Sequence, residues 1–152
     1  MKKIIHLFCF MLSFFGYSQV SNVSLVEINF SGGGNPRHLT KGTTKLYFTA
    51  SNEIVTRGLW AQDTVTGETY LVKDIHPEYN DTFGEYNSSF FTSGDMLYFL
   101  SQQPNNQVEL WKSDGTADGT HMIKIINPSG NIVFADVNFF FEYNNLIFFI
   151  AD

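Results

Sequence analysis

The sequence repeats itself at a spacing of 51 residues, and this repeat limits the possible folds more than any other feature. Leu46-Tyr47-Phe48 returns as Leu97-Tyr98-Phe99. The same spacing matches further residues: Leu59-Trp60 with Leu110-Trp111, Asp63 with Asp114, Thr69 with Thr120, and Pro77 with Pro128. A third, partial copy begins at Phe141. A fixed period near 50 residues is typical of repeat architectures, in which each unit packs against its neighbours.

Residues 1–18 have the pattern of a secretory signal peptide. Two lysines precede an apolar stretch over residues 4–15, and small residues lead to an expected cleavage site after Ser18. The apolar stretch is shorter than the roughly 20 residues that a membrane anchor needs. Cys9, the single cysteine of the chain, lies inside this segment. We therefore expect an exported mature chain without thiol or disulfide chemistry.

The charge of the chain argues against nucleic-acid and membrane partners. The formal net charge is −6, and loss of the two lysines of the leader makes the mature chain more acidic. Nucleic acids and anionic membranes need clustered positive charge, so we expect neither as a partner. Aromatic residues make up 16% of the chain and charged residues only 16%, which favours a packed β-rich core over disorder.

Within the second copy the local pattern predicts four short strands joined as a meander. These strands are expected at residues 90–92, 96–100, 108–111 and 122–126, with turns and polar breaks between them. The run at 96–100 is apolar at every position, which suits a strand covered on both faces. No stretch of ten residues has apolar positions at helical spacing.

Four strands per unit and a period near 50 predict an all-β fold of four-stranded antiparallel blades in a β-propeller-like array. We divide the chain as follows: signal peptide 1–18; N-terminal strand and glycine-rich joint 19–35; unit 1, 36–86; unit 2, 87–137; truncated unit 3, 138–152. Two full units and partial ones are too few to close a ring of about four to eight blades. The apolar strand expected at 146–150 has no following partner, so we expect a fragment of a longer protein; two blades completed by oligomerisation are the alternative.

The best-formed copy of the repeat carries a motif that resembles the signature of the ELWxxDGT repeat proteins. The matching residues are Glu109, Leu110, Trp111, Asp114, Gly115, Thr116, Gly119 and Thr120. The first unit keeps only Leu59, Trp60 and Asp63 of this pattern. The resemblance implies an exported protein of Bacteroidetes-type bacteria, often surface-associated, in a family without an established enzymatic activity.

The motif has a structural interpretation and a metal-binding alternative. Asp-Gly pairs form turns, because the carboxylate accepts a backbone N–H two residues on and glycine adopts positive φ without strain. Trp111 is expected to pack between units while its indole N–H reaches a carbonyl. Asp114 and Asp118 are weak calcium candidates, since calcium prefers several oxygen ligands. We favour the structural interpretation and expect no cofactor.

Other candidate groups show little sign of a shared site. Three histidines lack metal-type spacing and are interpreted as surface or strand-end residues: His38, His76 and His121. Asp81 and Glu85 form a carboxylate pair in an expected inter-unit loop, where solvation is favoured over glycoside chemistry. An aromatic group in the same connector suits packing or sugar binding: Tyr79, Phe83 and Tyr86.

The sequence therefore predicts a non-catalytic, exported repeat scaffold for adhesion or protein–protein interaction, located in the periplasm, at the cell surface or outside the cell. Its expected partners are other proteins or surface glycans, and no membrane insertion is expected after cleavage of the leader. The alternative is a glycan-binding or glycan-degrading propeller protein whose active residues lie in further blades.

Overall fold

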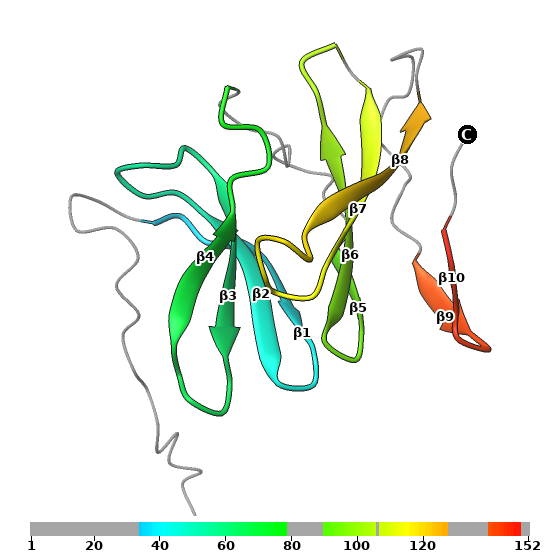
Figure 1. Cartoon of the computed structure of the whole chain (residues 1–152), viewed down its shortest axis with the longest axis horizontal. Coiled ribbons are helices and arrows are strands. Elements are labelled where there is room, and N and C mark those ends of the chain that lie inside the picture. The colour runs from blue at the N-terminus through cyan, green and yellow to red at the C-terminus, as the bar shows by residue number, and fades with distance from the viewer. Residues whose placement is uncertain (1–33, 79–89, 106, 128–139, 150–152) are drawn as a thin grey trace, which may run out of the picture.

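The computed structural model describes residues 34–78, 90–105, 107–127 and 140–149, and these residues form only strands, turns and loops (Figure 1). Two four-stranded antiparallel sheets and one hairpin are present. Their strands are, in chain order, β1 (Arg37–Lys41), β2 (Lys45–Ala50), β3 (Gly58–Asp63) and β4 (Thr69–Lys73); β5 (Phe90–Ser93), β6 (Met96–Gln102), β7 (Val108–Ser113) and β8 (His121–Asn127); and β9 (Phe141–Tyr143) with β10 (Leu146–Phe148).

Each sheet is a meander in which every strand pairs with the next one along the chain. The all-β class and the four-strand unit predicted from the sequence are confirmed, with strands up to two residues longer than expected at either end. Leader residues 1–18 and the strand expected in 19–35 lie outside the described residues. The third unit is represented by β9 and β10, and none of the described sheets closes into a barrel.

The sequence repeat is also a repeat of strand register. Trp60 lies opposite Leu71 across β3 and β4, and Trp111 lies opposite Met122 across β7 and β8. Both strand pairs carry a bulge immediately before the tryptophan. A bulge bends and twists its strand locally, so the two sheets have the same irregularity at the same point of the repeat.

The turns between the first two strands of a unit require unusual backbone conformations. Gly94 has a φ of +60° between β5 and β6, while Asn144 and Asn145 have φ values of +50° and +60° between β9 and β10. Glycine and asparagine are the residues that adopt this left-handed region most readily. The same hairpin is thus built with different turn residues in units 2 and 3.

The two large sheets pack face to face around one hydrophobic core. Alternate residues of β2 and β3 contribute Tyr47, Leu59 and Ala61, all fully buried. The opposing sheet contributes Leu97, Phe99 and Trp111 from β6 and β7, with the rings of Phe99 and Trp111 stacked at 6.1 Å. Leu100 of β6 is buried in a second core on the other side of its sheet, so the central strand is covered on both faces, as its apolar run predicts.

Equivalent residues of the two units touch one another at the β1–β2 and β5–β6 turns. The Asp95 carboxylate accepts hydrogen bonds from the Thr44 amide (2.7 Å), the Thr44 hydroxyl (2.5 Å) and the Lys45 amide (3.2 Å). Thr92 donates to the Lys41 carbonyl at 2.8 Å. Thr44 and Asp95 are 51 residues apart, as are Lys41 and Thr92.

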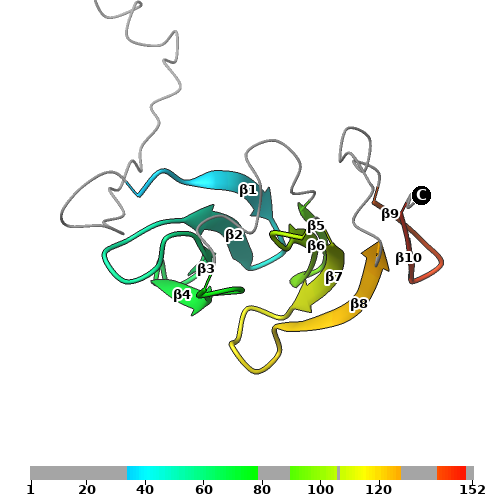
Figure 2. The ribbon, with the colours of Figure 1, turned by 90° about the horizontal axis from the view of Figure 1, so that it is seen from above.

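These contacts define how the units are arranged. A rotation that superposes unit 1 on unit 2 carries Thr44 to the position of Asp95. Because these two residues are in direct contact, the rotation moves them little, and they must lie close to its axis. β1 and β5 form the main backbone contact between the sheets, whereas β8 runs away from β4 towards its C-terminal end in both ribbon views (Figures 1 and 2). The two sheets therefore fan out from the side of their first strands.

The hairpin β9–β10 begins a second junction of the same kind. The first core contains Leu59, Ile75 and Phe99, with Phe90 packed against it. The corresponding residues of the next repeat come together in the second core: Leu110, Ile126, Phe149 and Phe140. The Phe90–Phe99 rings lie 5.4 Å apart at 43°, and the Phe140–Phe149 rings 5.6 Å apart at 39°. The junction between units is thus repeated along with the units themselves.

We expect the Asp95→Ala variant to unfold more easily, because it removes the acceptor of three hydrogen bonds that join the two sheets. The free energy of unfolding should fall by about 1–2 kcal/mol in urea denaturation. Glu53→Ala changes an exposed carboxylate elsewhere and should stay within about 0.5 kcal/mol of the parent. Equal effects of the two variants would contradict a joining role for Asp95.

Candidate functional site

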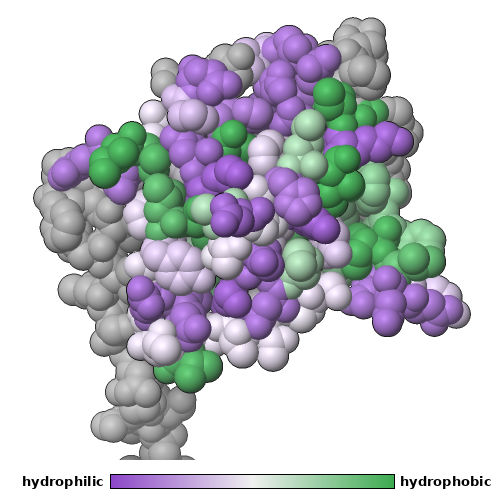
Figure 3. Space-filling view, viewed as in Figure 1, coloured by the Kyte–Doolittle hydropathy of each residue, from purple (hydrophilic) through white to green (hydrophobic). Residues whose placement is uncertain are grey.

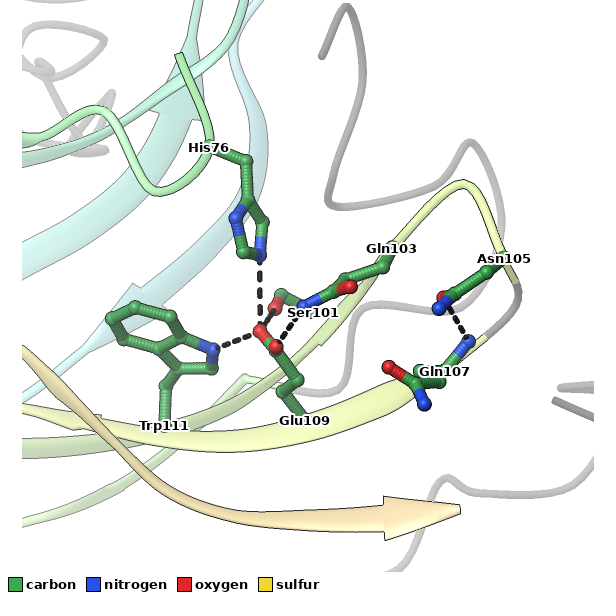
Figure 4. A network of polar contacts seen from close by, with 7 residues as sticks. All are labelled: His76, Ser101, Gln103, Asn105, Gln107, Glu109 and Trp111. Atoms are coloured by element: carbon green, nitrogen blue, oxygen red, sulfur yellow. Dashed lines mark hydrogen bonds and ion pairs between the residues drawn. The ribbon is translucent and has the colours of Figure 1, made fainter. Parts of the chain in front are cut away.

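The polar centre of the motif is the carboxylate of Glu109, which is only 2% exposed (Figure 4). Its Oε2 accepts hydrogen bonds from Trp111 Nε1 (2.9 Å), His76 Nε2 (3.0 Å) and Ser101 Oγ (3.1 Å), and Gln103 donates to Oε1. His76 follows β4 in the first unit, while the other donors belong to β6, β7 and the adjoining loop of the second. The network therefore links the two sheets.

This network keeps Glu109 ionised. Burial by itself raises the pKa of Glu109, but hydrogen bonds from Trp111, Gln103 and Ser101, together with the neighbouring His76, outweigh burial and lower the pKa below its ordinary value. An ionised carboxylate only accepts hydrogen bonds, and four donors already contact this one, three at Oε2 and one at Oε1. Glu109 is thus placed to hold the junction and poorly placed to donate a proton as a general acid.

For Trp111 the predicted hydrogen-bond acceptor is wrong, and the predicted packing between the sheets is confirmed. Its indole N–H donates to the Glu109 carboxylate instead of a carbonyl, since the glutamate two residues earlier lies on the same face of β7. Its ring packs in the core between the sheets, edge-on to His76 at 5.9 Å, as expected. In the first unit, where Gly58 replaces the glutamate, Trp60 donates to the Ala50 carbonyl at 3.1 Å.

The aspartate of the motif shapes the loop between β7 and β8. Asp114 Oδ1 accepts from the Thr116 amide at 2.8 Å and from the Thr116 hydroxyl at 2.7 Å. Asp63 does the same in the first unit, accepting from the Val65 and Thr66 amides at 2.8 Å. The bonds of Asp114 confirm the predicted turn, and in both units these bonds are the main cause of a lowered pKa of the aspartate.

The threonines of the motif complete the loop. Thr120 Oγ1 contacts Ser113 Oγ at 2.7 Å and donates to the Thr116 carbonyl at 2.6 Å. Thr116 Oγ1 accepts from the Gly119 amide at 2.9 Å. Ser113 and Thr120 are fully buried, so hydroxyl groups that would otherwise be unsatisfied in the interior are paired with one another.

The two glycines of the loop leave room for close contacts. Gly115 has a φ of +90°, and a Cβ there would lie 2.7 Å from Lys45 Cε of the first unit. At Gly119 a Cβ would lie 2.1 Å from Asp114 Oδ1, inside the carboxylate. Gly115 therefore allows the loop to meet the neighbouring sheet, and Gly119 allows the loop to close on its own aspartate.

A lysine of the first unit also holds this loop. Lys73, the last residue of β4, donates from Nζ to the Thr120 carbonyl at 2.8 Å and to the Ala117 carbonyl at 3.2 Å. Its ammonium satisfies carbonyl groups at the end of the loop. The motif is consequently contacted by the neighbouring unit at three places, through His76, Lys45 and Lys73.

The weak calcium candidates, Asp114 and Asp118, do not share a clear ligand set. Asp114 Oδ1 is engaged within its own turn, and Asp118 is exposed. In the described ranges no group of three or more His, Cys, Asp and Glu side chains is placed to hold a metal ion. Calcium prefers six to eight oxygen ligands, so this loop alone offers a poor site.

The other sequence candidates are dispersed. His38 stacks on Phe90 at 5.4 Å and contacts the Thr49 hydroxyl at 3.1 Å, and His121 is exposed on β8. His76 corrects the expectation of a surface residue, because it is 9% exposed and bound to Glu109. The carboxylate pair and the aromatic connector fall outside the described residues: Asp81 and Glu85; Tyr79, Phe83 and Tyr86.

Sequence comparisons and structural comparisons give this chain no relative. No protein-family model, no curated protein and no solved structure matches it. Among the described residues there is also no helix of the length and apolar character required to cross a membrane.

We expect Glu109→Ala to destabilise the fold strongly, since it leaves buried donors on Trp111, Ser101 and His76 without their acceptor. The free energy of unfolding should fall by about 3 kcal/mol. Glu109→Gln tests the charge. Because the folded pKa of Glu109 is lowered from 4.5, its stabilisation is present above that pH and is lost as the pH falls through the folded pKa.

The difference in unfolding free energy between the parent and Glu109→Gln should therefore be largest above the ordinary pKa of 4.5 and shrink as the pH falls below it. Denaturant unfolding at a series of pH values measures it. Glu142→Gln is the matched control at an exposed glutamate of β9 and should show no such trend. A difference that is constant with pH would rule out the ionised role of Glu109.

For calcium we expect calorimetric titration of the full chain to give no heat above that of buffer dilution, because the turn already uses Asp114 Oδ1 internally. Asp114→Asn retains a side-chain oxygen for the turn and removes the charge. Saturable heat that disappears in this variant would instead establish a calcium site.

Proposed function

We propose that this protein is a non-catalytic, exported repeat scaffold that acts in adhesion or protein–protein interaction. The observation that carries the proposal is the use of the motif's polar side chains inside the fold. Glu109, Trp111, Asp114, Thr116 and Thr120 all bond to groups of their own sheet or of the neighbouring one. A catalytic or ligand-binding motif needs polar groups aimed at a substrate, whereas the polar groups of this motif form hydrogen bonds within the fold.

We also propose that the units form a β-propeller-like array around an axis close to their first strands. The direct contact of equivalent residues, Thr44 with Asp95 and Lys41 with Thr92, supports such an axis. The recurrence of the same aromatic pair at the second junction supports a regular movement from one unit to the next. Radial repetition of four-stranded sheets is the arrangement of propeller blades.

The sequence adds the proposed family and location. The signature over residues 109–120 supports membership of the ELWxxDGT repeat proteins, and the pattern of residues 1–18 supports export. An acidic chain of net charge −6 suits contact with proteins better than contact with nucleic acid.

The proposal is tested by screening the full chain on a glycan array and against a panel of chromogenic glycosides and esters. A scaffold should give neither saturable glycan binding nor turnover above a buffer control. Asp114→Asn and Glu142→Gln serve as folded comparison variants at the motif and away from it. Saturable glycan binding or turnover above the buffer control would replace the scaffold with the glycan-binding or glycan-degrading alternative, and a loss confined to Asp114→Asn would place that activity at the motif.

A further inference from the structure

Apolar side chains gather on the side of the molecule formed by β8, β9 and β10 (Figure 3). The most exposed of them on β8 is Ile123, at 46%, while Leu146 of β10 is 61% exposed. Among the described strands, β10 pairs only with β9 and presents its other edge unpaired. We call Ile123 and the free edge of β10 the open face.

The first junction shows what covers the corresponding positions. Val72 stands 51 residues before Ile123, is 4% exposed, and belongs to the core that contains Trp111. β6 is the strand that corresponds to β10, because Met96 lies opposite Ser93 as Leu146 lies opposite Tyr143. β6 does not end in a free edge, since it pairs along its length with β7, which carries the motif.

The open face also repeats the polar half of that junction. Lys73 lies opposite Leu59 and binds carbonyl groups of the β7–β8 loop. Lys124 lies opposite Leu110 in the same register. A loop that approached β8 as the β7–β8 loop approaches β4 would therefore find an ammonium at the corresponding place.

The open face of unit 2 differs in charge from the corresponding face of unit 1, and the difference suits an acidic motif. Lys112 and His121 occupy the positions of Ala61 and Tyr70, opposite one another in the sheet. Burial raises the pKa of Tyr70, and negative charges that include Asp114 of the next unit raise it further. An aspartate placed like Asp114 would thus lie near Lys112, where opposite charges attract.

The second junction is already formed as far as the hairpin reaches. Phe140 and Phe149 pack on the core of Leu110 and Ile126, as Phe90 and Phe99 do in the first junction. The open face therefore continues the second junction. In the first junction the corresponding positions are covered by β7 and β8 of unit 2.

We infer that the open face binds a β-hairpin bearing the Glu-Leu-Trp-x-x-Asp-Gly-Thr motif, which pairs with the free edge of β10 and covers Ile123. The expected register places the tryptophan of the hairpin opposite Phe149, as Trp111 lies opposite Phe99. This inference rests on the repeat array under the proposed function and names the chemistry of the partner.

The test uses a fluorescent peptide that copies residues 107–127 and the full chain as receptor. Fluorescence anisotropy should show saturable binding. A peptide with alanine in place of its tryptophan should bind at least about 30-fold more weakly, since a buried aromatic anchor dominates such an interface. A peptide of equal length copying residues 56–76 has glycine for the glutamate and lacks the Gly-Thr of the loop, and should bind at least about tenfold more weakly.

Receptor variants locate the contact. Ile123→Ser should weaken binding at least about tenfold, by loss of apolar burial, whereas Ile54→Ser, at a residue 87% exposed in the first unit, should leave it unchanged. Denaturant unfolding of both variants checks that each is folded. Absence of peptide binding, binding insensitive to Ile123→Ser, or a self-association of the chain that Ile123→Ser abolishes would each overturn the inference.

Such a failure remains distinguishable from failure of the scaffold function. A chain that rejects the peptide and also gives no glycan binding or turnover keeps its scaffold role and loses only the proposed partner. A chain that binds glycans or hydrolyses them loses the scaffold role, whatever the peptide does.

Discussion

The buried carboxylate of Glu109 is the interaction on which the junction between the sheets depends. Taking a charge out of water is costly unless hydrogen bonds replace its hydration. Here His76, Ser101, Gln103 and Trp111 replace it, and one of these four donors comes from the neighbouring unit. The sheets must therefore dock correctly for the charge to be satisfied, which makes Glu109 a determinant of relative position as much as of stability.

The rest of the motif follows from this docking. Lys73 reaches the end of the loop, Gly115 lets the loop approach Lys45, and Asp95 binds the turn of the first sheet. These contacts involve different elements of the two sheets: the end of β4, the start of β2 and the turn between β5 and β6. Together they fix both the separation and the tilt of two sheets whose apolar faces alone would allow sliding, because hydrophobic contact is non-directional.

The sequence predicts what is local and periodic. The strands follow from apolar runs, and the turns at Asp63 and Asp114 follow from bonds to amides two residues away. The His76–Glu109 contact spans 33 residues and depends on how the sheets dock, so no local pattern reveals it. One signal was available: Thr44 and Asp95 occupy equivalent places in the repeat, but their contact requires knowledge of the axis. The partner of the Trp111 indole is different, because Glu109 lies two residues earlier on the same face of β7. That signal is local and was open to prediction from the sequence.

The second unit carries both a motif loop and, in Lys124, a lysine at the register position that Lys73 has in the first unit. A single period therefore contains both kinds of residue that meet where Lys73 binds the motif loop. Under the proposed array, copying one period in the gene would add a unit without requiring a new kind of contact. The first unit, with Gly58 in place of the glutamate and Trp60 bound to a carbonyl, shows how far one copy can diverge while its strands keep their register.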